Sequence, residues 1–553
     1  MRYVFGSLTE GDVRVLADDR YGAKPYGFLT EECREWDRRL RLPEINSGFE
    51  PVYWSQGQTL TKIEEDENGC FVDWDGEGAI PLTFAADLER EGNYRVTVEL
   101  WAEEAVEEAM LFLGRRRLAL LRDLPKGTRL QEQFVTNICP IIPRGQEDAE
   151  EDTTLDVTVI GKGLRLGMVD AAPWEGKTLY IAGDSTVTDQ SAEYPYLPGS
   201  SYCGWGQMLS AYLGCRMAVS NHAHSGLTTE SFRSEGHYQI LLDRILPGDV
   251  CLFQFGHNDQ KLDFLKAEEG YRENLLRYIR EIREKGACPV LVTPLARNSW
   301  RGDDGSYNDL LEPYETACQK IAKETGVPLL NLHQMSKAFI LEHGCEDAKR
   351  FFYPSDYTHS NDYGAYRFAE FIAKELVRCG IVEDVQAGEW NPPAKLPRLS
   401  VPAEFAGMKN PAEQPLFENL ERPGDLLTRA EALEFVIAAM RFFPTNVYND
   451  MFTDVIGHET YAGSVECAWQ NGLILPEMVR DQKIFPQELV TGGEFIRILL
   501  NGYKSRKPLP QPKEGQDWAD ILADAFCVLQ EGFSKEEPLT RALAADICQQ
   551  FRI

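Results

Sequence analysis

Three widely separated motifs carry the residue types that a serine hydrolase needs. Ser185 ends a Gly-Asp-Ser tripeptide, Asn258 lies in a Gly-His-Asn-Asp tetrapeptide, and an Asp-x-x-His motif joins Asp356 to His359. A serine hydroxyl is a poor nucleophile until a base removes its proton. We predict His359 as that base, and Asp356 as the residue that holds its imidazole in the productive tautomer.

Hydrolysis through a serine also requires donors for the negatively charged oxygen of the tetrahedral intermediate, each worth about 3–4 kcal/mol in comparable sites. We predict that the backbone N–H of Ser185, the backbone N–H of Gly226 and the side-chain amide of Asn258 form this oxyanion hole. Glycine at position 226 lets the backbone approach a substrate closely. Each motif taken singly is more often a helix cap, a surface pair or a turn, but their ordered coincidence favours catalysis.

The elements around these motifs alternate between strands and helices. Apolar runs predict strands, and longer amphipathic patterns predict helices between or after them. The strands are expected at 178–182, 216–220, 249–255, 288–293 and 327–332, and the helices at 204–214, 267–285, 309–325 and 363–379. Such alternation predicts parallel βαβ units. Ligands of parallel sheets bind at the carboxyl ends of the strands, where Ser185 and Asn258 fall.

The chain is long enough for several domains. Alternating short segments predict a β-sandwich-like accessory domain at 1–175, ahead of the α/β hydrolase domain at 176–382. A proline-rich stretch at 383–425 predicts a linker, and a helical domain follows at 426–553. In this last domain Leu-Thr-Arg-Ala-Glu at 427–431 returns in altered form at 490–494 and 539–543, which predicts two and a half copies of one helical unit.

The 553-residue chain carries 57 basic and 88 acidic residues, for a formal net charge of −31. This balance argues against nucleic acid or a membrane surface as partner, and means that an anionic substrate needs a locally basic cleft. The 13 cysteines contain no Cys-x-x-Cys motif and fit reduced thiols. No membrane span is expected, and the first residues lack the apolar core of a secretory signal, so we predict a cytoplasmic protein and consider a wall-associated one less favoured.

The motifs resemble those of the SGNH (GDSL-like) hydrolase family, and more narrowly its rhamnogalacturonan acetylesterase branch. The resemblance covers the segments 180–187, 204–209, 221–226, 254–259, 293–297 and 357–365. It implies a flavodoxin-like three-layer fold and a serine esterase that removes O-acetyl groups from pectic oligosaccharides through an acetyl-serine, without a cofactor. The branch usually reads Gly-Arg-Ser where this chain has Gly226-Leu227-Thr228, which leaves the exact polysaccharide open.

Further residues near the predicted site are candidates for substrate contacts. His257, Lys261, Arg297 and Trp205 are the candidates, although packing explains His257 and Trp205 at least as well. His222 and His224 have the spacing of metal ligands, but without accompanying carboxylates we predict no metal site.

The tail is similar to S-layer homology repeats, in a degenerate form that favours packing or homo-oligomerisation over wall anchoring. The N-terminal domain is the other candidate for an oligomer contact. The alternatives are an esterase acting on another acetylated sugar or small ester, and a wall-associated carbohydrate-binding protein with a vestigial esterase site.

Overall fold

The computed structural model falls into two compact units, which we describe separately. The first contains residues 1–296, 311–353 and 359–398, and the second contains 297–310, 354–358 and 399–553. The structure describes residues 1–6, 12–29, 62–142, 147–192, 195–301, 305–354, 356, 358–396, 420–442, 444, 448–457, 459–507, 509–512 and 515–551. The predicted linker at 383–425 therefore lies partly outside the described residues.

The first unit begins with two largely antiparallel sheets. One has the order β10 (Thr128–Ile138), β7 (Gly92–Ala102), β12 (Leu164–Pro173), β1 (Arg2–Val4) and β2 (Val13–Arg14), with β4 (Ile63–Asp66) and β5 (Gly69–Val72) attached beside β12. The other has the order β3 (Tyr26–Phe28), β6 (Leu82–Asp87), β11 (Thr154–Ile160), β8 (Val106–Leu113) and β9 (Arg117–Leu124). From Tyr94 on, strand β7 alternates buried side chains with half-buried or exposed ones, as expected of a strand with one face toward a core.

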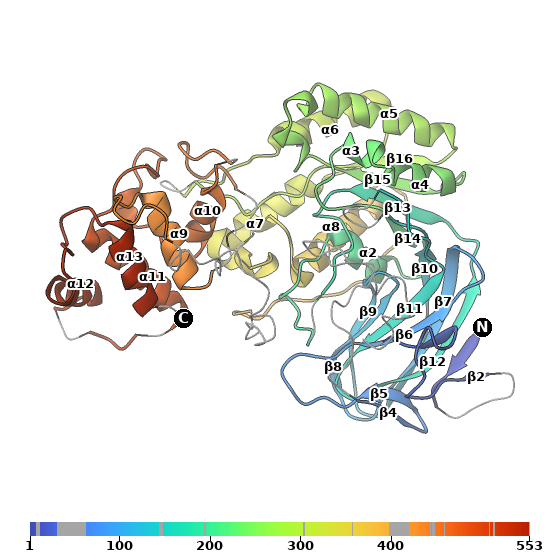
Figure 1. Cartoon of the computed structure of the whole chain (residues 1–553). Coiled ribbons are helices and arrows are strands. Elements are labelled where there is room, and N and C mark those ends of the chain that lie inside the picture. Colours follow the sequence, from blue (N-terminus) through green and yellow to red (C-terminus); the bar gives the residue numbers. More distant parts are fainter. Residues whose placement is uncertain are drawn as a thin grey trace. The chain divides into compact units, whose positions relative to one another are not determined.

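Both sheets contribute to one hydrophobic core. Phe5, which directly follows β1 of the first sheet, packs edge-on against Phe84 of β6 in the second sheet. Their ring centroids lie 4.9 Å apart, and both rings are fully buried. Strand β9 also contacts helix α2 (Trp205–Leu213), and β10 contacts β14 (Ala218–Asn221). The N-terminal sheets therefore pack directly on the α/β part of the same unit (Figure 1).

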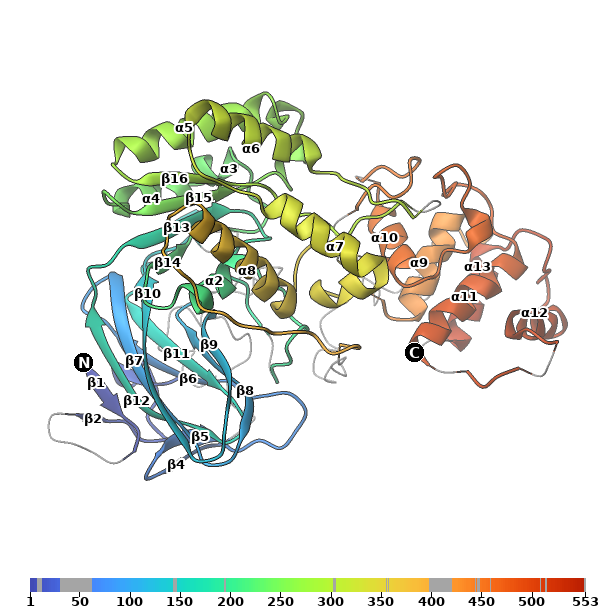
Figure 2. The same ribbon diagram turned by 180° about the vertical axis from the view of Figure 1, so that it is seen from behind.

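The α/β part is built on a parallel sheet of the order β14, β13 (Thr178–Gly183), β15 (Val250–Gln254), β16 (Cys288–Val292) and β17 (Leu329–Leu330). Every pairing in it is parallel. Helices α5 (Gly270–Glu284) and α6 (Glu312–Thr325) lie on one side of the sheet, and α2 and α8 (Asp362–Arg378) lie on the other (Figures 1 and 2). The predicted α/β fold with a parallel sheet is confirmed.

Some elements differ from those predicted. The strand expected at 327–332 is only Leu329–Leu330, because helix α7 (Leu332–Ala348) begins two residues later. Helix α7 was not predicted, and neither were the short helices α3 (Ser231–Ser234) and α4 (His237–Arg244). The apolar residues of α7 follow no clear helical stripe, so periodicity alone could not identify it.

The second unit contains helices α9 (Arg429–Ala439), α10 (Ala462–Gln470), α11 (Gly492–Arg506), α12 (Trp518–Leu529) and α13 (Arg541–Gln550). Their apolar side chains form one core that includes Leu433, Val465 and Ile498. Within the described parts of the chain, no helix has both the length and the apolar composition that crossing a membrane requires.

The three related segments of the second unit begin α9, α11 and α13. Thr428 and Thr491 each form a complete capping box with a glutamate three residues later, whereas Thr540 caps its helix without one. Two ion pairs join the first copy to the other two. Arg429 of the first pairs with Glu494 of the second at 3.4 Å, and Arg541 of the third pairs with Glu431 of the first.

In each of these pairs, the arginine of one copy meets the glutamate of another. A third pair of this kind would join the arginine position of the second copy to the glutamate position of the third. The arginine position of the second copy is Gly492, and the glutamate position of the third is Leu543. The two departures that make the repeats look degenerate are therefore the two ends of one missing ion pair. Losing both partners together leaves no unpaired charge inside the helical core.

Candidate active site

Ser185 lies on a tight turn directly after strand β13. A Cβ atom at Gly183 would come within 2.8 Å of the carbonyl oxygen of Gln254 on β15, so this position requires glycine. The Asp184 side chain is fully buried, and its Oδ1 accepts hydrogen bonds from the backbone N–H (3.0 Å) and hydroxyl (2.8 Å) of Thr186. Burial raises the pKa of Asp184, an effect that the Thr186 hydrogen bonds oppose. These bonds fix the turn that presents the partly exposed Ser185.

The same turn is anchored to the core through Trp205. Gln254 Nε2 donates to the Thr186 hydroxyl, and Trp205 Nε1 donates to Gln254 Oε1, both at 2.9 Å. The Trp205 side chain has no exposed surface. The structure therefore places this candidate sugar-stacking residue in the core, where it supports the serine turn instead.

The predicted base reaches the predicted nucleophile. His359 Nε2 lies 2.7 Å from Ser185 Oγ, although the two residues are 174 positions apart. The His359 ring meets the Tyr202 ring edge-on at 5.7 Å, and Tyr202 in turn stacks on Tyr353 at 3.7 Å. The backbone N–H of Tyr353 donates to the carbonyl oxygen of His359 at 2.9 Å. The histidine is thus held by its backbone and by an aromatic wall that the sequence analysis missed.

The loops after β14 and β15 bring the predicted oxyanion donors to the same edge of the sheet. Gly226 has a φ of +86°, a region that favours glycine, and open space where a side chain would point. Asn258 Nδ2 donates to Leu227 O at 3.0 Å, which joins the two loops. Gln190 Nε2 donates to Ser185 O (3.3 Å) and Ser225 Oγ (3.5 Å), joining the serine turn to the β14 loop.

Asp259 fixes the loop that carries Asn258. Its carboxylate is fully buried and accepts hydrogen bonds from the Thr229 N–H and hydroxyl and from the Gly256 N–H, at 2.6–3.1 Å. Burial raises the pKa of Asp259 to about 6. The role of Asp259 could not be predicted from the sequence, because an aspartate next to an asparagine after a strand is typical of a solvated turn.

Asp356 and Arg297 belong to the second unit, where both are buried. Asp356 Oδ1 accepts a hydrogen bond from the backbone N–H of Thr358 at 3.3 Å. Asn449 Oδ1 accepts hydrogen bonds from the Thr358 hydroxyl at 3.1 Å and from Arg297 Nη1 at 3.4 Å. With 5% of its surface exposed, Arg297 serves this polar cluster and offers little surface to a sugar.

A buried glutamate completes the Asn449 cluster. Glu466 accepts hydrogen bonds from the backbone N–H (2.9 Å) and side-chain amide (3.0 Å) of Asn449. Burial raises the pKa of Glu466 from 4.5 to about 7, with a smaller contribution from the charge of Asp356. The folded state therefore binds this proton more tightly than the unfolded chain does, so stability from Glu466 is greatest at low pH and is lost as pH rises through 7.

We accordingly expect Glu466→Gln to flatten the pH dependence of stability. The wild-type pKa shift corresponds to a loss of about 3 kcal/mol between pH 4.5 and 8. The measurement is the melting temperature from pH 5 to pH 8, in which the wild-type value should fall more steeply than that of the variant. The exposed Glu459 provides the control: Glu459→Gln should leave the slope unchanged. Equal slopes for wild type and Glu466→Gln would contradict the assignment.

The other two candidates for substrate contacts differ in exposure. His257 is buried, with 2% of its surface exposed. Lys261 is exposed, and its Nζ donates to Asn258 Oδ1 at 3.0 Å. Of these two, Lys261 is the one placed to meet a ligand, and it brings a positive charge to the loop of the predicted oxyanion amide.

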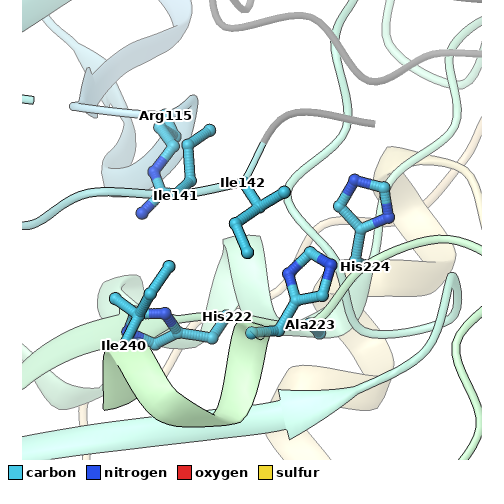
Figure 3. Close-up of a pocket in the computed structure, with 8 residues that line it drawn as sticks. Arg115, Ile141, Ile142, His222, Ala223, His224 and Ile240 are labelled. Carbon is cyan, nitrogen blue, oxygen red and sulfur yellow. The ribbon is translucent and has the colours of Figure 1, made fainter. Parts of the chain in front are cut away.

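His222 and His224, which follow β14, line a small cavity of about 10 Å³, roughly the space that one water occupies (Figure 3). His222 Nε2 lies 2.9 Å from Ser220 Oγ, and burial lowers the His222 pKa well below its usual range. His224 Nδ1 lies 3.3 Å from Ser225 O. In the part of the chain that the structure describes, no three His, Cys, Asp or Glu residues group in a way that would hold a metal ion.

The arrangement is suited to attack on an ester carbonyl. A hydroxyl and an imidazole lie in hydrogen-bond contact, which lets the ring take the proton as the oxygen attacks. Backbone and amide donors lie on the adjacent loops, where the oxyanion would form. The catalytic roles of Ser185, His359, Asp356, Gly226 and Asn258 stay predictions.

Comparison with known proteins supports this chemistry. Residues 181–366 match the model of the GDSL-like Lipase/Acylhydrolase family. The rhamnogalacturonan acetylesterase RhgT of Bacillus subtilis is 34% identical over 217 residues, which cover 37% of this chain and 90% of that protein. The uncharacterized esterase YxiM of the same organism is 31% identical over 383 residues, which cover 68% of this chain and 90% of that protein.

A crystal structure of YxiM from Bacillus subtilis is also similar, with a TM-score of 0.36 and 25% identity, covering 69% of this chain and 98% of that one. The resemblance to SGNH hydrolases is confirmed, because this chain matches 90% of the length of two esterases to which it is more than 30% identical. The matched family region contains every predicted catalytic residue from Ser185 to His359. The chain belongs to the GDSL-like lipase/acylhydrolase family and is a carboxylic ester hydrolase.

Proposed function

We propose that the protein is a carbohydrate O-acetylesterase acting on acetylated pectic oligosaccharides of the rhamnogalacturonan type. The contact of 2.7 Å between Ser185 Oγ and His359 Nε2 carries the proposal for ester cleavage. The relatives named rhamnogalacturonan acetylesterases support the choice of an acetylated sugar. The C-terminal repeats are a packing or oligomerisation module in this proposal, and the enzyme trims small fragments in the cytoplasm.

The reaction proceeds in two steps. Ser185 Oγ attacks the acetyl carbonyl while His359 takes the hydroxyl proton, and the oxyanion is held by the donors at Ser185, Gly226 and Asn258. The bond between the acetyl carbon and the sugar oxygen breaks, and the protonated His359 gives its proton to that oxygen, which leaves as a hydroxyl group. Water then attacks the acetyl-serine with His359 again as base, which releases acetic acid and restores the serine.

The exposed Lys261 supports an anionic sugar as substrate. The chain as a whole carries a net charge of −31, which repels a polyuronate. The ammonium group of Lys261 lies 3.0 Å from Asn258 Oδ1 and thus beside the predicted oxyanion hole. A uronate carboxylate next to the acetylated residue would be attracted to this local positive charge.

The test is acetate release from acetylated rhamnogalacturonan oligosaccharides, neutral acetylated xylo-oligosaccharides and an aryl acetate, by wild type and Lys261→Gln. We expect the wild type to prefer the acidic fragments. The variant should raise KM for them about fivefold, because it loses the binding free energy of one partly screened ion pair. KM for the neutral xylo-oligosaccharides should not change. Lys266→Gln removes the same charge from a nearby exposed position and is the control.

Each other outcome has a definite meaning. Equal loss on acidic and neutral substrates would show that Lys261 acts on Asn258 and not on a uronate. Activity on the aryl acetate or on xylan fragments alone would retain the esterase and discard the pectic substrate. No acetate release from any substrate would favour a carbohydrate-binding protein with a vestigial site.

A further inference from the structure

The hairpin between β8 and β9 inserts consecutive arginines into the protein interior. Residues Arg115, Arg116 and Arg117 follow Gly114, and their exposed fractions are only 5%, 0% and 2%. Arginine is almost never fully buried unless it is paired. Arg116 also has a φ of +49°, which a non-glycine residue adopts only when its surroundings hold it there. Full burial of the Arg116 guanidinium therefore requires polar or charged partners.

Arg116 reaches out of the N-terminal sheets into the hydrolase part of the first unit. Its Nη1 lies 3.3 Å from Asp362 Oδ1, and neither side chain is exposed. Its Nη2 donates to the backbone carbonyl of Tyr202 at 2.8 Å and to Gln207 Oε1 at 3.4 Å. Gln207 Nε2 donates back to Arg116 O at 3.2 Å. One guanidinium thus binds two separate segments of the hydrolase.

Both segments adjoin the predicted base. Asp362 is the third residue after His359 and the first residue of α8. Tyr202 packs its ring edge against the His359 ring at 5.7 Å, and its backbone forms a β-bridge with Asn361. Movement of either segment would therefore displace the imidazole relative to Ser185.

The same contacts extend along the segment that precedes Tyr202. Asp362 Oδ1 also accepts a hydrogen bond from the Tyr196 hydroxyl at 2.8 Å, and its Oδ2 accepts one from the Gly199 N–H at 2.9 Å. Ser360 Oγ donates to Cys203 O at 2.7 Å. The arginine and the aspartate together are the centre of a buried network that clamps the residues on both sides of His359.

We propose that Arg116 is a positioning residue for catalysis, which holds His359 against Ser185 by binding both Asp362 and the Tyr202 carbonyl. The N-terminal sheets therefore contribute a residue that positions the catalytic base of the hydrolase. This role depends on the Ser185–His359 pair, and not on which sugar the enzyme deacetylates. An aryl acetate is accordingly the substrate for the test.

Arg116→Lys keeps the charge opposite Asp362 but loses the planar fork that reaches both partners. We expect a kcat on aryl acetate about 10- to 100-fold below wild type with an unchanged KM, because a displacement of about 1 Å has effects of this size. The rate at which a fluorophosphonate modifies Ser185 should fall by the same factor. That rate reports proton transfer to His359, which a purely structural change away from the site does not affect.

A second variant distinguishes loss of positioning from misfolding. Arg116→Met alone leaves Asp362 as a buried unpaired charge, whereas the double variant Arg116→Met/Asp362→Asn removes both charges and keeps an amide oxygen that can accept a hydrogen bond from Tyr196 or Gly199. The double variant should melt near the wild-type temperature and still show the loss in kcat. Either folded variant with kcat and modification rate within twofold of wild type would overturn the proposal.

Arg165 offers a matched control within the same sheets. It is 8% exposed and pairs with Asp66 at 2.6 Å and Glu103 at 2.5 Å, all within the N-terminal part of the chain. Arg165→Met should lower the melting temperature without changing kcat. An equal loss of kcat in Arg165→Met would show that the N-terminal sheets act only through general stability, and would also overturn the positioning role.

Discussion

Ser185→Ala is expected to lower kcat on any ester substrate by about 10⁴-fold or more. The nucleophilic oxygen lies 2.7 Å from His359 Nε2, and alanine leaves the imidazole with no hydroxyl to deprotonate. The oxyanion donors and the substrate site remain, so a small residual rate and unchanged substrate binding are expected. Acetate release under saturating aryl acetate measures the loss, and calorimetry with an unreacted oligosaccharide measures the binding.

Ser210 gives this prediction its control. It is a half-buried serine on α2 in the same α/β part, and Ser210→Ala should retain full activity, since alanine is favourable in a helix. Full activity in Ser185→Ala would show that another residue is the nucleophile. Loss of activity together with loss of binding and a lower melting temperature would indicate an unfolded site and not a missing nucleophile.

The positions of Ser185 and Asn258 could be predicted because they follow from the topology of a parallel sheet. Adjacent parallel strands end at one edge, and β13 pairs with both β14 and β15, so the loops after them must meet. The contact between His359 and Ser185 was predicted from the chemistry of the motif. Local sequence does not give the distance between two side chains that are 174 positions apart, and this distance comes from the structure.

Arg116 could not be predicted, for the opposite reason. Three arginines after a glycine in a hairpin are typical of an exposed turn. The partners of the buried Arg116 lie far along the chain, namely Asp362 at a separation of 246 residues and Tyr202 at 86. The burial of a charged residue can be predicted only when its partner is known, and no periodic pattern in the sequence identifies a partner so far along the chain.

The Asn449 cluster illustrates the same limit for Arg297. Position after a predicted strand made this arginine a candidate for the ligand edge. Its side chain instead donates to Asn449, which follows it by 152 residues in the second compact unit. The rule for strand ends locates a loop, but the contacts of that loop decide which of its side chains face a ligand.

His359→Ala is expected to reduce kcat by several orders of magnitude, about 10³-fold or more. The imidazole serves both steps, first taking the serine proton and then activating water, so acylation and deacylation should slow together. Exogenous imidazole should restore part of the activity in the variant, because removal of the ring leaves space next to Ser185 Oγ. The measurement is steady-state hydrolysis of an aryl acetate with and without added imidazole.

The matched control for this variant is His343, which pairs with Asp347 at 2.5 Å on helix α7. Like Asp356 and His359 it belongs to an aspartate–histidine pair, but in the part of the chain that the structure describes its contacts are with Asp347, Phe339 and Phe351, so His343→Ala should retain the wild-type kcat. A loss below tenfold in His359→Ala would count against its role as base. Equal losses in both variants would mean that removing a histidine destabilises the fold, and the contact of 2.7 Å would then lose its catalytic meaning.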